Sequence, residues 1–139
     1  MVGPEHVAAG VMGRWQVTLA RVNCPGGIWY GKVNEQAVAS YAMLVVTAEP
    51  IVRISDGRYH RLFAVRISVW GDAGADKFSA GGTARAAIEA MMPGLTVPEA
   101  IKVVDIRTGT GELNVEDSPR NASDVCLATM EWRVLIEGN

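Results

Sequence analysis

One stretch decides the fold of this chain: Gly57-Arg58-Tyr59-His60-Arg61-Leu62-Phe63-Ala64-Val65-Arg66-Ile67-Ser68-Val69-Trp70-Gly71. Its odd-numbered positions are mainly apolar or aromatic, whereas its even-numbered positions include Arg58, His60 and Arg66. Successive side chains of a strand point to opposite faces of a sheet, so this period of two predicts one long strand. We expect the odd-numbered face to cover a core and the even-numbered face to meet water or a partner.

The composition of the chain predicts a single globular domain spanning residues 1–139. Hydrophobic residues make up 49% and charged residues 20% of the sequence, close to globular averages, which excludes wholesale disorder. The net charge of −2 lacks the basic excess of a nucleic-acid-binding domain, so we expect no sequence-specific nucleic-acid partner. The sequence has neither an apolar run of about 18 residues nor a signal-peptide pattern. We therefore expect no membrane partner and a protein that is made and kept in the cytoplasm.

Two helices are predicted, one on each side of the long strand. The first lies between Pro4 and Cys24, and the residues expected on its core side are Val7, Val11, Met12, Trp15 and Leu19. The second follows Gly71, with Asp72 as its N-cap and Gly81-Gly82 as a soft point where it kinks or breaks. The residues expected on its core side are Phe78, Ala84 or Arg85, Ile88, and Met91 or Met92.

Shorter apolar patterns predict the remaining strands. These are Ser40–Thr47, Ala100–Arg107 and Asp124–Glu137, with Ile51–Ile54 extending the ladder before a turn at Ser55-Asp56-Gly57. Ile28–Val33 is either a short edge strand or an aromatic loop. One face of the last strand is expected to hold Cys126, Ala128, Met130, Trp132, Val134 and Ile136. The order of elements is therefore one helix, two or three strands, a second helix and two further strands.

No residues in the sequence have the spacing of a catalytic or metal site. His6 and His60 have no Cys, Asp or Glu at ligand spacing, so we expect no metal and no cofactor. Cys24 is a conceivable thiol nucleophile, but no histidine is placed to activate it, and a buried cysteine more often acts as a small hydrophobic residue. The sequence therefore favours a protein that is not an enzyme.

Two junctions between elements carry a resemblance to a known protein family. The long strand ends in Val69-Trp70-Gly71-Asp72, and an alanine-rich helix follows directly. A polar segment, Ser118-Pro119-Arg120-Asn121, precedes a closing strand that ends Trp132-Arg133-Val134-Leu135-Ile136-Glu137. This order resembles the tail terminator (tail completion) proteins of long-tailed bacteriophages and related gene transfer agents. The resemblance implies an α+β fold: a twisted, mainly antiparallel sheet of four to five strands with two main helices packed on one face. It also implies a virion protein of the tail or neck, assembled in the host cytoplasm, that caps the tail tube as a homohexameric ring. Such a protein contacts the tail tube protein and the head–tail connector protein.

Segments 53–61 and 107–123 are the predicted interface, because they combine arginine, aromatic residues and polar backbone. The residues expected there are Arg53, Arg58, Tyr59, His60, Arg61, Arg107, Glu112, Glu116, Asp117 and Arg120. A solvated sheet face on which arginine stems cover apolar surface would explain the arginines equally well. The segment from Thr108 to Ser123 is predicted to be a loop that is either mobile or ordered by a partner.

Two alternative functions stay open at the level of the sequence. A head–tail adaptor or a tail tube subunit would also be a small α+β ring protein of a virion. A ligand-binding or enzymatic α+β domain that dimerises through its sheet would instead need a pocket joining Trp29, Tyr41, His60 and Trp70.

Overall fold

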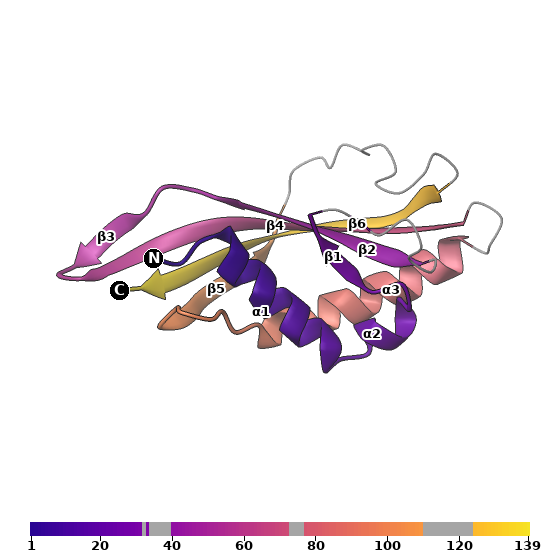
Figure 1. The fold of residues 1–139 in the computed structure, drawn as a ribbon, viewed down its shortest axis with the longest axis horizontal. Helices are drawn as coiled ribbons and strands as arrows, with labels where there is room; N and C mark the ends of the chain where they lie inside the picture. The colour runs from indigo at the N-terminus through magenta and orange to yellow at the C-terminus, as the bar shows by residue number, and fades with distance from the viewer. Residues whose placement is uncertain (32, 34–39, 73–76, 110–123) are drawn as a thin grey trace.

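The computed structural model describes residues 1–31, 33, 40–72, 77–109 and 124–139, which form an elongated sheet with helices against it (Figure 1). The strands are β1 (Ile28–Tyr30), β2 (Tyr41–Ala48), β3 (Val52–Ser55), β4 (Arg58–Asp72), β5 (Lys102–Thr108) and β6 (Asp124–Gly138). Their order is β1-β2-β4-β6-β5, and β3 pairs with the first residues of β4. β1 runs parallel to β2, whereas the other pairs are antiparallel. With the short edge strand β1 and the hairpin strand β3, the described residues form six strands rather than the predicted four to five.

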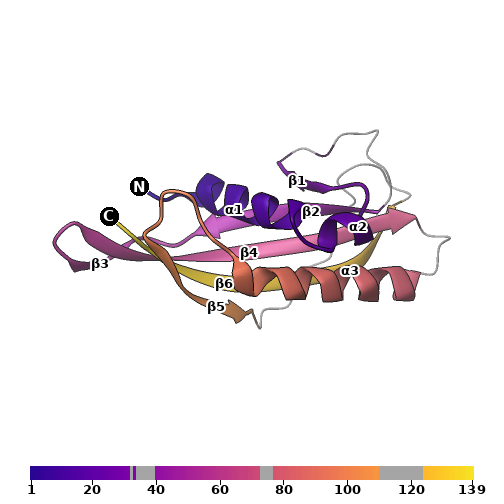
Figure 2. The same ribbon diagram turned by 90° about the horizontal axis from the view of Figure 1, so that it is seen from below.

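The helices cover one face of this sheet (Figure 2). They are α1 (Pro4–Gln16), the single-turn α2 (Ala20–Asn23), α3 (Lys77–Met91) and the 3₁₀ turn η1 (Met92–Gly94). α1 packs against β2, and α3 packs against β6 and β4. The predicted fold class, with two main helices on one face of a mainly antiparallel sheet, is confirmed. Within the described ranges, none of the helices is long and apolar enough to cross a membrane.

The central strand β4 has the two different faces that its alternation predicts. The side chains facing the helices are fully buried: Phe63, Val65, Ile67 and Val69. Those on the opposite face are only partly buried: Leu62, Ala64, Arg66 and Ser68. Each fully buried aliphatic or aromatic side chain contributes roughly 1.5–3 kcal/mol through removal of its apolar surface from water.

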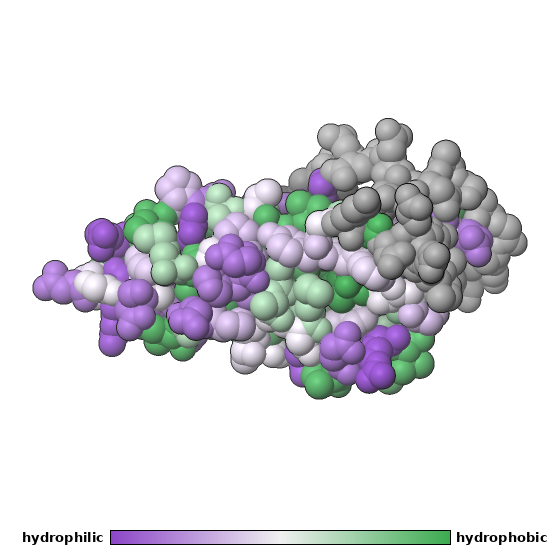
Figure 3. Space-filling model, viewed as in Figure 1, coloured by the Kyte–Doolittle hydropathy of each residue, from purple (hydrophilic) through white to green (hydrophobic). Residues whose placement is uncertain are grey.

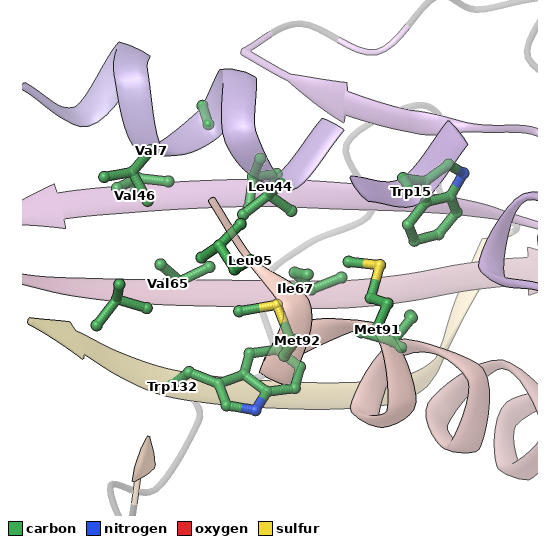
Figure 4. Packing of buried hydrophobic residues seen from close by; sticks show 14 of the residues in the cluster. Val7, Trp15, Leu44, Val46, Val65, Ile67, Met91, Met92, Leu95 and Trp132 are labelled. Carbon is green, nitrogen blue, oxygen red and sulfur yellow. The ribbon is translucent and has the colours of Figure 1, made fainter. Parts of the chain in front are cut away.

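The core is a layer of side chains between the helices and the sheet (Figure 4). Trp15 from α1 and Met91 from α3 meet over the sheet, where Ile67 of β4 lies beneath them. Trp132 of β6 extends the layer under η1. A large side chain therefore anchors each main helix to the sheet, and the two helices share one core rather than two.

A bulge in β6 overturns part of the predicted face of that strand. Val69 of β4 pairs with Ala128, but the next residue, Trp70, pairs with Cys126, so Leu127 is the extra residue. The extra residue shifts the alternation by one. Cys126 therefore packs on the helix-free face beside Trp70, whereas Ala128 packs on the helical core. The prediction that both share a face was wrong, because periodicity alone cannot reveal an inserted residue.

The first helix ends earlier than predicted. α1 stops at Gln16, and the Thr18 amide bonds to the Trp15 carbonyl in a tight turn before α2. Val7, Val11 and Trp15 are buried as expected, but Leu19 lies beyond the end of α1 and is 70% exposed. Placing Leu19 in the core was therefore wrong. The physical reason is that the break changes the direction of the chain and rotates Leu19 away from the sheet.

Two predictions about the second helix were also wrong. Asp72 is not its N-cap, because it is the last residue of β4 and pairs with Asp124 of β6. α3 runs without a break through Gly81 and Gly82. A Cβ atom on Gly81 would lie 2.5 Å from the Leu127 carbonyl oxygen, so Gly81 lets α3 approach the bulged backbone of β6. Ala84, Ile88 and Met91 are buried as predicted, while the side chain of Phe78 lies outside the described residues.

Candidate interaction surfaces

The β3–β4 hairpin forms one end of the molecule and projects beyond the helices (Figure 1). Asp56 and Gly57 join its strands, and Gly57 has a φ of 71°, a conformation that costs glycine little. All four residues of β3 are exposed, including Val52 at 63% and Ile54 at 46%. Exposed aliphatic side chains on a protruding edge strand are unusual for an isolated subunit, so this hairpin is the first candidate surface.

Two of the predicted interface arginines lie on this hairpin with their side chains in solvent. Arg53 is in β3 and Arg58 begins β4, and both are exposed. Arg58 is two residues from Asp56 across the turn. Arginines beside aliphatic side chains make a surface that can bury its apolar part and hydrogen-bond at its rim. The position of both residues is thus compatible with the predicted interface.

Two other predicted interface residues, Tyr59 and Arg61, stabilise the fold of the subunit itself. Tyr59 is 4% exposed, and its hydroxyl accepts a hydrogen bond of 2.8 Å from the Val2 amide. The Arg61 guanidinium donates to the Val2 carbonyl at 2.8 Å and to the Glu49 carbonyl at 2.9 Å, and it lies 5.5 Å above the Phe63 ring. These contacts tie the N-terminus to the sheet. They leave Tyr59 almost no surface for a partner.

The remaining predicted residues divide into two groups. His60 lies on the helix-free face, where its Nε2 is 3.8 Å from Oε1 of Glu137 in β6. Arg107 of β5 is exposed and pairs with Asp105. Arg107 pairs with Arg133 of β6, which in turn pairs with Ala64 of β4. Ala64 is four residues from His60, which corresponds to roughly 13 Å along β4. The acidic residues Glu112, Glu116 and Asp117 and the basic Arg120 lie outside the described residues.

The segment joining α1 to α2 forms a second candidate surface, which the sequence did not reveal. Val17, Leu19 and Val22 are 75%, 70% and 73% exposed. They border two adjoining hollows of about 750 and 610 Å³ that share Leu19, Ala87 and Ala90. We call the surface made by Val17, Leu19, Val22, Ala86, Ala87 and Ala90 the apolar groove; polar side chains also line the two hollows, among them Arg21, Asn23 and Thr83. In Figure 3, hydrophobic patches lie at the lower edge of the molecule, with hydrophilic residues between them.

The pocket required by the ligand-binding alternative does not form from the four predicted residues. Trp29, Tyr41 and Trp70 do come together on the helix-free face, in a packed cluster with Val33. His60 is ten residues from Trp70 on the same strand, which corresponds to roughly 33 Å. The aromatic residues therefore pack on one another, and the histidine lies too far away to act on anything bound between them.

The other candidate groups have structural roles. Burial raises the pKa of the Cys24 thiol to about 11, so it is a poor nucleophile at neutral pH. The Nδ1 atom of His6 accepts a hydrogen bond of 2.9 Å from the Gly3 amide at the start of α1. Among the residues described by the structure, no group of three or more His, Cys, Asp or Glu side chains could hold a metal ion.

Comparison with known proteins identifies a shared fold. No protein-family model and no curated protein sequence matches the chain. Among solved structures, a chain described as "Virion of native gene transfer agent (GTA) particle" superposes with a TM-score of 0.71. The alignment covers 96% of both chains at 18% sequence identity. This likeness shows that the two chains share their fold from end to end, while function has to be argued separately.

Proposed function

We propose that this protein is a structural component of a phage or gene-transfer-agent virion that caps the tail tube as a ring and forms part of the head–tail joint. The observation that carries the proposal is the similarity of the whole fold to a chain in a gene transfer agent virion. The two exposed apolar surfaces add support, because subunits of an assembly keep such surfaces for their neighbours. Cys24 is a poor nucleophile because of its raised pKa, and His60 lies far along β4 from the aromatic cluster around Trp70. Both observations are consistent with a protein whose role is not catalytic.

The mechanism of such a protein is geometric. A ring that matches the end of the tube covers the last layer of tube subunits and stops further polymerisation. Its opposite face then presents a new surface to the head–tail connector. Every subunit of the ring must contact two neighbours through different patches, so each subunit needs two distinct interaction surfaces. The hairpin and the apolar groove are two such surfaces in the described part of the chain.

The first test is the oligomeric state and shape of the purified protein. Size-exclusion chromatography with light scattering, followed by negative-stain imaging, should reveal a closed hexameric ring. Antibody labelling of purified particles should then place the protein at the tail or neck of the virion. A stable dimer without rings, together with unlabelled particles, would contradict the proposal and favour the ligand-binding class.

A charge reversal tests the predicted role of the hairpin. Arg58→Glu should leave a folded subunit and impair assembly, because Arg58 is exposed and makes no core contact. Lys102→Glu provides the matched control, since Lys102 is an exposed cation on the opposite edge strand. Normal rings formed by the Arg58→Glu protein would exclude this turn from the interface.

A further inference from the structure

The N-terminal segment, residues 1–3, is held in place by three hydrogen bonds to side chains. The Tyr59 hydroxyl accepts from the Val2 amide at 2.8 Å, and the Arg61 guanidinium donates to the Val2 carbonyl at 2.8 Å. The third bond runs from the Gly3 amide to Nδ1 of His6, at 2.9 Å. Val2 is buried in the core cluster, so these bonds keep an apolar side chain in position. Only the third bond depends on a histidine, the side chain type whose charge changes between about pH 5 and 8.

The geometry of that third bond defines the protonation state of His6. A backbone N–H can only donate, so Nδ1 accepts and carries no proton in this arrangement. His6 is the third residue of α1, and Gly3 is the N-cap. At this position of a helix, glutamate or glutamine commonly reaches back to the amide of the N-cap residue. His6 makes the same contact with a side chain that can be protonated.

A second partner for Nδ1 of His6 lies close by. Oε1 of Glu5 is 3.4 Å from this nitrogen. A carboxylate can only accept, so it can bond Nδ1 only when that atom carries a proton. A positive charge at the N-terminal end of a helix is opposed by the helix dipole, and the Glu5 carboxylate offsets this repulsion. The same nitrogen therefore has a donor beside it for its neutral form and an acceptor for its protonated form.

The other elements that pack against α1 bring few charges to this contact. β1 and β2 contain no acidic or basic residue, and β4 contributes the Arg61 guanidinium described above. The segment after η1 approaches α1 at Gly10, one helical turn further on, and its charged residue is the exposed Glu99. α3 contacts α1 near the opposite end, where Arg14 donates to a carbonyl of α3. Met1 is exposed, so its amino group lies in water.

We propose that His6 is a pH-sensitive anchor of the N-terminal segment. While His6 is neutral, its Nδ1 accepts from Gly3 and helps to hold residues 1–3 on the sheet. After protonation, Nδ1 donates to the Glu5 carboxylate and the Gly3 amide loses its acceptor. The segment is then held by Tyr59 and Arg61 alone and opens more often. Its contribution is therefore present at high pH and is lost as the pH falls, at the end of the sheet that also carries the hairpin (Figure 1).

Hydrogen–deuterium exchange of the intact protein tests this inference. The exchange of the Gly3 amide is followed by mass spectrometry with fragmentation to single residues, between pH 8 and pH 5.5. Each rate is corrected for the intrinsic exchange rate at that pH. The protection of the Gly3 amide should fall by roughly two- to tenfold at the lower pH, the change expected from the loss of one hydrogen bond.

Substitutions at the two histidines of the chain identify the group responsible. His6→Gln keeps an oxygen that accepts from the Gly3 amide but does not titrate, so protection at pH 5.5 should remain at its pH 8 level. His6→Phe removes the acceptor and should give low protection at both pH values. His60→Gln is the matched control, because His60 pairs with Glu137 instead and its replacement should leave the pH dependence unchanged.

Glu5→Gln tests the second partner of His6. Without the carboxylate the protonated ring is less favourable, so the midpoint of the change in Gly3 protection should move to lower pH. An unchanged or higher midpoint would overturn the exchange of partners. Constant Gly3 protection in the wild type, the wild-type pH dependence in His6→Gln, or its loss in His60→Gln would overturn the inference as a whole. These measurements concern residues 1–6 and do not depend on the proposed ring function.

Discussion

The two faces of β4 show how one strand can serve two purposes. Its helix-facing side chains, from Phe63 to Val69 at every second position, have no exposed surface, whereas their neighbours on the other face remain partly in solvent. The helix face is closed by α1, α3 and η1 from within the chain. The opposite face and the projecting hairpin are not covered by those helices. The subunit's stability therefore depends on the first face, and its contacts with other molecules have to come from surfaces outside it.

The largest expected effect comes from placing a charge on the covered face. Ile67→Asp should prevent folding, because Ile67 is fully buried and an unpaired carboxylate there costs on the order of 4–5 kcal/mol or more. The measurement is the soluble yield together with the thermal unfolding transition. Ser68→Asp places the same charge one residue further, on the partly exposed face, and should cost less than about 1 kcal/mol. Equal losses from the two variants would contradict the assigned difference between the faces.

A smaller effect is expected where α3 approaches the sheet. Gly81→Ala should destabilise the protein by roughly 1–3 kcal/mol, because the new Cβ would meet the Leu127 carbonyl at 2.5 Å and α3 would have to shift. Gly82→Ala meets no atom within 4 Å and should instead stabilise the helix by up to about 1 kcal/mol. Urea unfolding of both variants measures the difference. If both variants had a higher free energy of unfolding than the wild type, the close packing of α3 on the β6 bulge would be refuted.

A loss of about 1–2 kcal/mol is expected from the hydrogen bond that anchors the N-terminus. Tyr59→Phe keeps the ring on the covered face but leaves the buried Val2 amide without its acceptor. Urea unfolding should show the loss, and limited proteolysis should cut the N-terminal segment faster. Tyr30→Phe is the control, since Tyr30 is 43% exposed and its replacement should change the unfolding free energy little.

The smallest effect at neutral pH concerns the two cysteines, one in the core and one on the helix-free face. Cys24 should react with a thiol reagent far more slowly than Cys126, because burial raises the pKa of Cys24 to about 11 and also blocks access. The raised pKa means that the folded state holds the proton more tightly than the unfolded state. The corresponding stability is therefore present below pH 9 and is lost as the pH rises toward 11. Cys24→Ala should remove this loss, as urea unfolding at both ends of that range would show.

Much of the fold follows from patterns that are local in the sequence. The alternation from Tyr59 to Val69 sets the long strand and its buried face, since the period of two is a property of any extended backbone. Similar patterns locate β2, β5 and β6 to within a few residues. The spacing of Val7, Val11 and Trp15 identifies the core side of α1 for the same reason, with the helical period in place of two.

The candidate surfaces were less accessible to such reasoning. Arg53 and Arg58 are exposed as the hypothesis requires, but Tyr59 and Arg61 serve Val2, a residue more than fifty positions away. The groove was missed because Leu19 continues the apolar spacing of α1, although the helix has already ended. The spacing of apolar side chains does not indicate where the backbone hydrogen bonds of a helix end.

The sequence by itself determined the long strands, the core side of α1 and which face of the central strand is buried, because these depend on residues close together in the chain. Only the tertiary structure decided that Leu127 is a bulge, that Gly81 fits over it, and that Cys126 therefore faces away from the helices. It also decided that Leu19 and the hairpin are left uncovered. These features depend on strand register and on contacts between segments that are distant in the sequence. Such contacts stabilise the protein only once the whole core has formed, so no single stretch of sequence specifies them.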